Sequence, residues 1–201
     1  MPVSYAVNGS TLTASAGTTP VFTLVLQANG GYTFTLRAPI DHALGNGENL
    51  RTLDLSSAIV ATDFDGDALT LSNALSIVVI DDIPRDPNIQ GARTVPEDAT
   101  SPITGTWTNA VGADQPGSSV VVRVGGQDHA LGSPITVTVG NQTLGTLTVN
   151  PNNTWSFDPN PNLVNPNGVN FDFTIRVTDA DGDTQSDSDT INVTDLSLIH
   201  I

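Results

Sequence analysis

The chain has 201 residues, and its 21 acidic residues against six basic ones give a formal net charge of −15 at pH 7. All six basic residues are arginines, and a surface of this charge repels nucleic acids and anionic membranes. The absence of cysteine excludes disulfide bonds and thiol chemistry, and no apolar run reaches the roughly 18 residues that a transmembrane helix needs. We expect Met1 to be a start codon added to an internal fragment, with any export signal lying elsewhere.

The first predicted elements in chain order form a β-hairpin. Apolar residues alternate along 21–27 and 32–36, on either side of an Asn29-Gly-Gly31 turn. Period-2 alternation about an Asn-Gly pair indicates two antiparallel strands. Further along, the sequence predicts a loop over 38–49 and strands over 50–62 and 68–80.

The second half of the chain repeats this order of elements. An asparagine-rich turn precedes Trp155-Ser-Phe157, which corresponds to Tyr32-Thr-Phe34 of the first hairpin. Residues 171–178 alternate between apolar and polar side chains, which predicts a strand with one buried face. Other strands are predicted at 119–124, 134–140, 142–150 and 184–194. Since helical periodicity is absent, the predicted fold class is all-β, and two units of about a hundred residues suit two β-sandwiches.

The repeat divides the chain into four parts. Residues 1–83 and 98–195 are predicted to form the two β-sandwiches, and residues 84–97 a linker that its three prolines stiffen. Residues 196–201 follow the last acidic residue and fit no pattern. They are either a tail added for expression or the start of another module.

One acidic motif occurs twice, as Asp63-Phe-Asp-Gly-Asp67 and as Asp179-Ala-Asp-Gly-Asp183. Three carboxylates at alternate positions about a glycine turn direct oxygen atoms to one point, and Ca²⁺ takes six to eight oxygen ligands. The motif is not an EF-hand, because its glycine is fourth and Ala74 and Thr190 stand where the bidentate glutamate would be. The alternative is an Asp-Gly turn with solvated acids, but such a turn needs neither further aspartates nor a second copy. We therefore predict calcium ligation by Asp63, Asp65, Asp67, Asp179, Asp181 and Asp183.

Further acidic residues flank the predicted linker. They are Asp81, Asp82 and Asp86 at one end and Glu97 and Asp98 at the other. Taken singly, each group is more simply a solvated surface or a strand end. Taken together, they suggest one Ca²⁺ that both ends bind and that rigidifies the linker. Asp187 and Asp189 share one face of the last strand, where they either reach the Asp179 loop or face water.

The sequence lacks the common catalytic motifs. His42 and His129 each follow an aspartate in a predicted loop, the usual setting of a surface pair. There is no G-x-S-x-G elbow, no H-E-x-x-H and no glycine-rich phosphate loop. We therefore predict that the protein is not an enzyme.

In their order along the chain, these motifs resemble the repeats of giant bacterial RTX adhesins, which are exported by type I secretion. In the first unit the resemblance rests on the stretches Asn29–Leu36, Pro39–His42, Ala61–Asp67 and Asp81–Pro84. In the second unit, Trp155-Ser-Phe157 and Val177–Asp183 are similar to the cadherin-like and bacterial Ig-like extender modules of the same proteins. The resemblance covers nearly all of residues 3–195.

The resemblance implies two tandem Ig-like or cadherin-like antiparallel β-sandwiches, joined by a short linker that calcium rigidifies. It implies calcium ligation by the six motif aspartates and also by Asp81, Asp82, Glu97 and Asp195. The first unit resembles one half of a domain that an inserted ligand-binding module splits. The implied role is that of a secreted extender at the bacterial cell surface, which projects ligand-binding domains for cell adhesion and biofilm formation.

We expect a monomer whose partners are neighbouring repeats of the same adhesin and a glycan or protein ligand. Ca²⁺ would bind only the folded chain, so the low calcium of the cytosol would keep it unfolded for secretion. The alternative function is a carbohydrate- or protein-binding module of a surface adhesin. That function needs an exposed aromatic platform, for which Tyr5 and Trp107 are the candidates, since Trp155 is assigned to the core.

Overall fold

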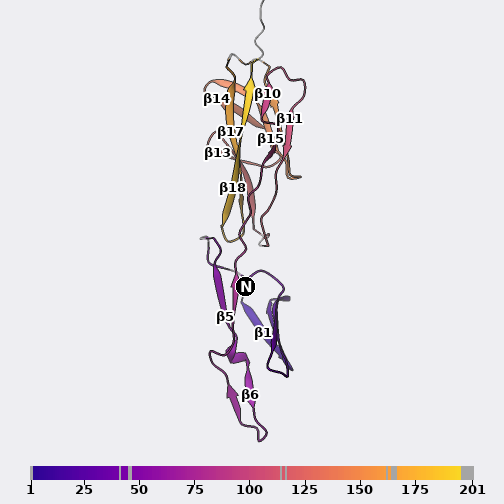
Figure 1. Ribbon diagram of the computed structural model, residues 1–201, viewed down its shortest axis with the longest axis vertical. Helices are drawn as coiled ribbons and strands as arrows, with labels where there is room; N and C mark the ends of the chain where they lie inside the picture. The colour runs from indigo at the N-terminus through magenta and orange to yellow at the C-terminus, as the bar shows by residue number, and fades with distance from the viewer. Residues whose placement is uncertain are drawn as a thin grey trace, which may run out of the picture. The chain divides into compact units, whose positions relative to one another are not determined.

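The computed structural model describes residues 2–40, 42–44, 47–113, 115, 117–161, 163 and 167–195. The predicted tail at 196–201 lies outside the described residues. The contacts within the chain divide it into two compact units, Met1–Asp82 and Ile83–Ile201, called unit 1 and unit 2 (Figure 1).

Unit 2 is a sandwich of two five-stranded sheets, in the orders β10-β18-β17-β12-β13 and β14-β15-β16-β11-β9 (Figure 1). Its strands are β9 (Gln90–Gly91), β10 (Thr94–Pro96), β11 (Ile103–Thr106), β12 (Ser119–Val124), β13 (Gln127–Ala130), β14 (Ile135–Val139), β15 (Gln142–Val149), β16 (Thr154–Pro159), β17 (Val169–Thr178) and β18 (Thr184–Thr194). Strands β10 and β18 pair in parallel, and the other paired strands of the two sheets are antiparallel.

Alternating side chains build the core of unit 2. Phe171, Phe173, Ile175 and Val177 are buried along β17, as the sequence predicts. Trp155 of β16 packs across the sandwich against Phe173, with 5.5 Å between the ring centroids. Eighteen buried residues among those described form one cluster, so this unit has an ordinary single-domain core.

The structure differs from the sequence prediction at residues 84–97. This range, which we predicted to be a linker, contains β9 and β10 and belongs to unit 2. Ile89 and Val95 from this range are 2% and 1% exposed and join the core. The two strands are hard to recognise in sequence because they are very short. Moreover, β10 pairs with a strand almost a hundred residues away, opposite Asn192–Thr194.

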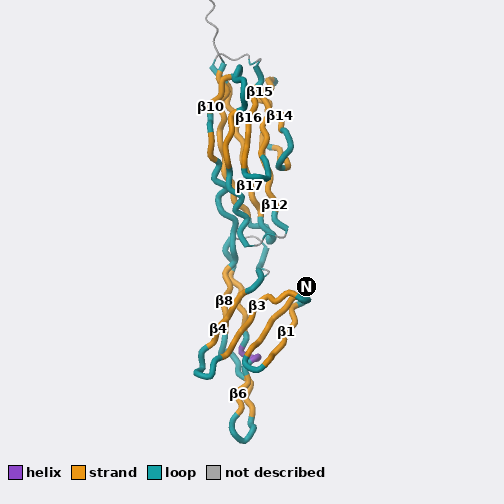
Figure 2. The backbone as a smooth tube through the Cα atoms, turned by 90° about the vertical axis from the view of Figure 1, so that its right-hand side faces the viewer, coloured by secondary structure: helices purple, strands orange, loops and turns teal. Residues whose placement is uncertain are grey.

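Unit 1 has one four-stranded antiparallel sheet, in the order β1-β2-β3-β4, and two short ladders, β5–β8 and β6–β7 (Figure 2). The strands are β1 (Val3–Asn8), β2 (Thr11–Ala16), β3 (Thr19–Leu26), β4 (Tyr32–Leu36), β5 (Leu50–Asp54), β6 (Val60–Thr62), β7 (Ala68–Thr70) and β8 (Ser76–Ile80). Within the described residues, the only helix is the 3₁₀ turn η1 (Ser56–Ala58), so the predicted all-β class is confirmed. No helix in that part of the chain is long and apolar enough to cross a membrane.

The hairpin predicted around the Asn29 turn is confirmed as β3–β4, with Leu24 opposite Phe34. Phe22 and Leu24 are 2% exposed, and the ring of Phe22 lies 5.1 Å from that of Phe34. Among the described residues, seven buried residues make up the core of unit 1, against eighteen in unit 2. Unit 1 therefore buries much less apolar surface than unit 2 does.

Candidate metal centre

The loop Asp179–Asp183 joins β17 to β18 in unit 2. Asp179 fixes its shape, because Oδ1 of this side chain accepts hydrogen bonds from the N–H groups of Gly182 (3.0 Å) and Asp183 (2.8 Å). The N–H of Asp179 donates to the carbonyl of Asp183 at 3.1 Å and closes the loop. Gly182 has a φ of +102°, which explains why glycine occupies this position.

The loop also brings carboxylates together. Asp181 and Asp183 have carboxylate oxygens within 4.8 Å of each other. Asp179 and Asp183 are only 3% and 7% exposed, although aspartate is seldom buried. The second oxygen of Asp179, Oδ2, is buried and accepts no hydrogen bond from the residues that the structure describes. A bound cation would satisfy such an oxygen.

The electrostatics of Asp179 agree with this geometry. Its pKa is raised to about 6, first by burial and then by the side chain of Asp181. The hydrogen bonds that it accepts from the backbone of Asp183 and Gly182 oppose the rise. A negative charge is therefore costly at this position until a positive charge compensates it.

The first copy of the motif forms the same loop at the tip of the β6–β7 hairpin in unit 1. Asp63 Oδ1 accepts hydrogen bonds from the N–H groups of Gly66 (3.1 Å) and Asp67 (2.9 Å), and the N–H of Asp63 donates to the Asp67 carbonyl at 3.0 Å. The carboxylate oxygens of Asp63, Asp65 and Asp67 lie within 4.8 Å of one another.

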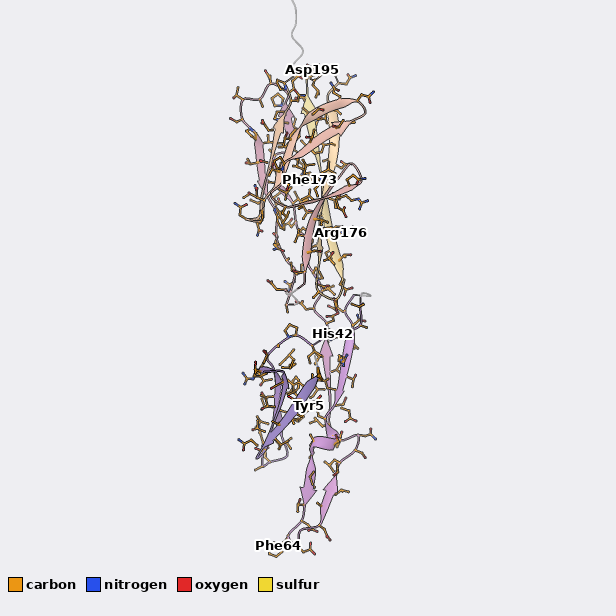
Figure 3. The ribbon with its side chains drawn as sticks, turned by 180° about the vertical axis from the view of Figure 1, so that it is seen from behind. Tyr5, His42, Phe64, Phe173, Arg176 and Asp195 are labelled. Atoms are coloured by element: carbon orange, nitrogen blue, oxygen red, sulfur yellow. The ribbon has the colours of Figure 1, made fainter. Side chains whose placement is uncertain are left out.

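The two loops differ in burial. Asp63, Asp65 and Asp67 are all exposed, and the pKa of Asp63 is lowered, chiefly by its hydrogen bond with the side chain of Asp65. Phe64, in the same loop, is fully exposed at the tip of the hairpin (Figure 3). The Asp63 loop brings all three of its carboxylates within 4.8 Å, the Asp179 loop brings Asp181 and Asp183 within that distance, and only the Asp179 loop has buried carboxylates.

Residues 94–194 match the family model of the bacterial Ig domain, and this range is half of the chain. The chain belongs to the bacterial Ig domain family. Such domains have a non-catalytic fold and are often extracellular or exposed at a surface. A search of curated proteins finds no match to the chain.

A second acidic group lies at the opposite end of the bacterial Ig domain from the Asp179 loop, where Figure 3 labels Asp195. Glu97 follows β10, and its N–H donates to the carbonyl of Thr194 at 2.9 Å. Burial raises the pKa of Glu97, and the carboxylates of Asp195 and Asp98 add to the rise, whereas a hydrogen bond from the N–H of Leu163 (2.6 Å) opposes it. The side chain of Glu97 thus interacts with those of Asp98 and Asp195, and calcium ligation by these three residues stays a prediction.

Asp86 lies far from this group, contrary to the prediction that it shares one ion with Glu97 and Asp98. Three residues after Asp86, the N–H of Ile89 donates to Asp187, near the start of β18 (2.6 Å). Glu97 bonds to Thr194, at the end of the same strand. Seven residues of extended strand span about 23 Å. Asp86 instead shapes a turn, in which Oδ1 accepts from the N–H of Asn88 at 2.9 Å.

In unit 1, Asp81 is buried next to a histidine that sequence reasoning placed at the surface. The His42 side chain is 4% exposed, and its Nδ1 lies 3.3 Å from the Asp81 carboxylate. No local signal could have indicated this pair, because the two residues are far apart in sequence. Asp82 is exposed. Calcium ligation by Asp81 and Asp82 stays a prediction.

The sequence left two alternatives for Asp187 and Asp189, reaching the Asp179 loop or facing water, and the structure shows a third arrangement. Asp187 accepts the hydrogen bond from Ile89, and Asp189 accepts one from Arg93 Nε at 2.5 Å. Both aspartates of β18 therefore hold the β9–β10 segment in place. Asp128, which precedes His129, also has a structural role, since it pairs with Arg123 (3.2 Å) and Arg176 (2.7 Å).

The alternative function, a carbohydrate- or protein-binding module, needs an exposed aromatic platform, and one of its two candidate residues is exposed. Trp107 is 3% exposed and donates its indole N–H to the Asn150 carbonyl at 3.3 Å, so it belongs to the core. Trp155 is 1% exposed, as predicted. Tyr5, on β1, is 60% exposed.

Proposed function

We propose that this protein is a calcium-dependent structural module of a large secreted bacterial adhesin of the RTX type. Ca²⁺ binds the Asp-x-Asp-Gly-Asp loops, stabilises the folded chain and rigidifies it. The module thereby projects ligand-binding domains of the same adhesin in cell adhesion and biofilm formation. The family membership supports a module of an extracellular or surface protein.

The observation that carries the calcium proposal is the buried Oδ2 of Asp179. Oδ1 of the same side chain already accepts two backbone hydrogen bonds, so Oδ2 is the oxygen left for a ligand. Asp181 and Asp183 add carboxylates within the same loop. Carboxylate oxygens are the ligands that Ca²⁺ prefers, and its flexible coordination tolerates the remaining positions being filled by carbonyls or water.

Calcium would act by binding the folded state in preference to the unfolded one. The gain in stability is RT ln(1 + [Ca²⁺]/Kd), which is about 1.4 kcal/mol at ten times Kd. Extracellular calcium modules have a Kd of roughly 10⁻⁴–10⁻³ M, so millimolar external calcium would stabilise the module. In a low-calcium cytosol, the clustered carboxylates would disfavour the folded state.

Thermal unfolding in EDTA and in millimolar CaCl₂ tests this proposal. We expect calcium to raise the melting temperature, and MgCl₂ at equal concentration to raise it less, because Mg²⁺ demands a stricter geometry. In Asp181→Asn, the rise caused by calcium should be largely lost, whereas the melting temperature in EDTA should change little. An equal loss in both conditions would contradict calcium binding at this loop.

Asp65→Asn is the matched variant, since it changes the same position of the exposed loop in unit 1. Because Asp65 lies in a solvated loop without a buried carboxylate, we expect this substitution to reduce the effect of calcium less than Asp181→Asn does. If calcium leaves the melting temperature of the unmodified chain unchanged, the loops are ordinary turns and the proposed function is wrong.

A further inference from the structure

Units 1 and 2 share a series of turns at a constant separation of 123 residues. At each of these turns, one residue with a positive φ stands at the same place in both units. The pairs are Gly9 and Gly132, Gly17 and Gly140, and Gly30 and Asn153. The irregularity in the β2–β3 pairing after Ala14 matches the one in the β14–β15 pairing after Val137, at the same separation. Strands β1–β4 therefore correspond to β13–β16.

The correspondence extends to the acidic hairpin. The loop Asp63–Asp67 has the same hydrogen bonds as Asp179–Asp183, so β5–β6 and β7–β8 together correspond to β17 and β18. Unit 1 thus contains counterparts of β13–β18. Among its described residues, it has no counterparts of β9–β12, which residues 83–126 supply in unit 2.

The strands without counterparts complete the sheets of unit 2. There, β12 pairs with both β13 and β17, β10 pairs with β18, and β11 pairs with β16. In the described part of unit 1, β5 and β8 pair only with each other, and β4 pairs only with β3. Strand β1 pairs with β2, whereas its counterpart β13 pairs with β12. The edges left open in unit 1 are those that β10, β11 and β12 occupy in unit 2.

Trp155 and its counterpart in unit 1 show how strands β9 and β11 cover an aromatic side chain in unit 2. Trp155 is 1% exposed, and its indole N–H donates to the carbonyl of Gln90 in β9 at 3.0 Å. A Cβ added at Gly105 of β11 would lie 2.4 Å from the Trp155 ring, so β11 also covers this side chain closely. The counterpart of Trp155 is Tyr32, which is 50% exposed. The described part of unit 1 therefore has no strands that cover Tyr32 as β9 and β11 cover Trp155.

The same contrast holds for apolar side chains in general. Among the residues that the structure describes, all but one of the large apolar side chains that are exposed belong to unit 1, and the exception is Val139. Several lie on β1, β5 and β8, the strands with open edges: Val3, Tyr5, Val7, Leu50, Val78 and Ile80. Exposed apolar patches beside open strand edges mark sites where further strands add to a sheet.

We propose that unit 1 is the carboxyl-terminal part of a bacterial Ig sandwich, and that a segment of the same polypeptide outside these 201 residues completes it. The segment carries strands equivalent to β9–β12. Its β10- and β12-like strands pair with β8 and β5, and its β9- and β11-like strands cover Tyr32. On completion, β1 exchanges its pairing with β2 for pairing with the β12-like strand. This inference is independent of calcium binding, because it rests on turn geometry, strand pairing and burial, none of which needs a bound ion.

Hydrogen exchange and sedimentation of the 201-residue chain test the open edges. We expect a monomer in which the amides of β5 and β8 exchange at least a hundredfold faster than those of β17 and β18. A dimer with protected β5 and β8 would make a second copy the occupant and overturn the proposal. Protection of β5 and β8 in the monomer, equal to that of β17 and β18, would also overturn it.

Fusing strands of the β9–β12 type to the chain tests whether they complete unit 1. A second copy of residues 83–126 is joined through a flexible linker to Pro2 of the full chain. We expect exchange at β5 and β8 to slow at least tenfold and Tyr32 to become protected from solvent quenching. In a control graft, the residues corresponding to Val120, Val122 and Val124 are replaced by serine, and no slowing is expected. If the two grafts behave alike, strands of the β9–β12 type do not complete unit 1.

Discussion

Asp179 and Asp63 perform the same structural task in different surroundings. Each uses Oδ1 to accept two backbone hydrogen bonds within its loop. Burial is the first cause of the raised pKa of Asp179, which is 3% exposed, whereas the pKa of the exposed Asp63 is lowered chiefly by the side chain of Asp65. The sequence predicted both loops, because the spacing of the aspartates and the glycine is local. It could not predict the burial, which depends on residues distant in the chain.

The raised pKa of Asp179 predicts how stability depends on pH without calcium. Because its pKa is about 6 in the folded state and 3.8 in the unfolded state, the folded state binds more protons between these values. The contribution of Asp179 to stability in EDTA should therefore be fully present below pH 4 and be lost as the pH rises through 6, a total of about 3 kcal/mol. Urea unfolding followed by tryptophan fluorescence measures the effect in unit 2, which contains Trp107 and Trp155.

Asp179→Asn provides the control for this titration. The amide oxygen can still accept the hydrogen bonds from Gly182 and Asp183, whereas the ionisable group is removed. The pH dependence in EDTA should be shallower in the variant than in the unmodified protein. If both proteins lose stability equally between pH 4 and pH 7, the charge of Asp179 is not the cause.

Elements with local patterns were predictable, and those held by distant partners were not. The β3–β4 hairpin and β17 follow from alternation over many residues, and their burial is as predicted. Strands β9 and β10 lie in a proline-rich stretch, and their partners come from β11 and β18. Their anchors Asp187 and Asp189 are nearly a hundred residues away, so sequence spacing alone suggested a linker.

The pairing of Arg93 with Asp189 predicts the stability of the β9–β10 segment. Asp189 is 6% exposed, and Arg93→Ala would leave its buried carboxylate without this charged partner. We expect Arg93→Ala to lower the free energy of unfolding of unit 2, measured by urea unfolding, by more than the loss of an exposed ion pair does. Adding Asp189→Asn to the variant should restore part of the loss, because the buried charge is then removed.

Arg123→Ala is the matched control for Arg93→Ala. Arg123 pairs with Asp128, which is substantially exposed and also pairs with Arg176. Removing it should change the stability by no more than about 0.5 kcal/mol, as is usual for exposed ion pairs. Equal effects of the two arginine substitutions would show that Arg93 does not anchor the segment.

At the scale of the whole molecule, the two units differ in core size. In the part of the chain that the structure describes, unit 2 has eighteen buried residues in one cluster and unit 1 has seven. Since burial of apolar surface is the main stabilising contribution, unit 1 should be the less stable unit. The internal repeat predicted two related units from sequence, but their unequal cores became visible only when strand pairing was known.

The unequal cores predict two unfolding transitions in calorimetry of the full chain in EDTA. Phe22→Ala removes a buried ring from the core of unit 1, and Phe173→Ala removes one from unit 2. Each should cost about 3–5 kcal/mol, so Phe22→Ala should lower only the first transition and Phe173→Ala only the second. Calcium should raise the second transition more than the first, because the loop with the buried carboxylate belongs to unit 2. A single transition that both substitutions lower would instead mean that the two units unfold as one cooperative structure.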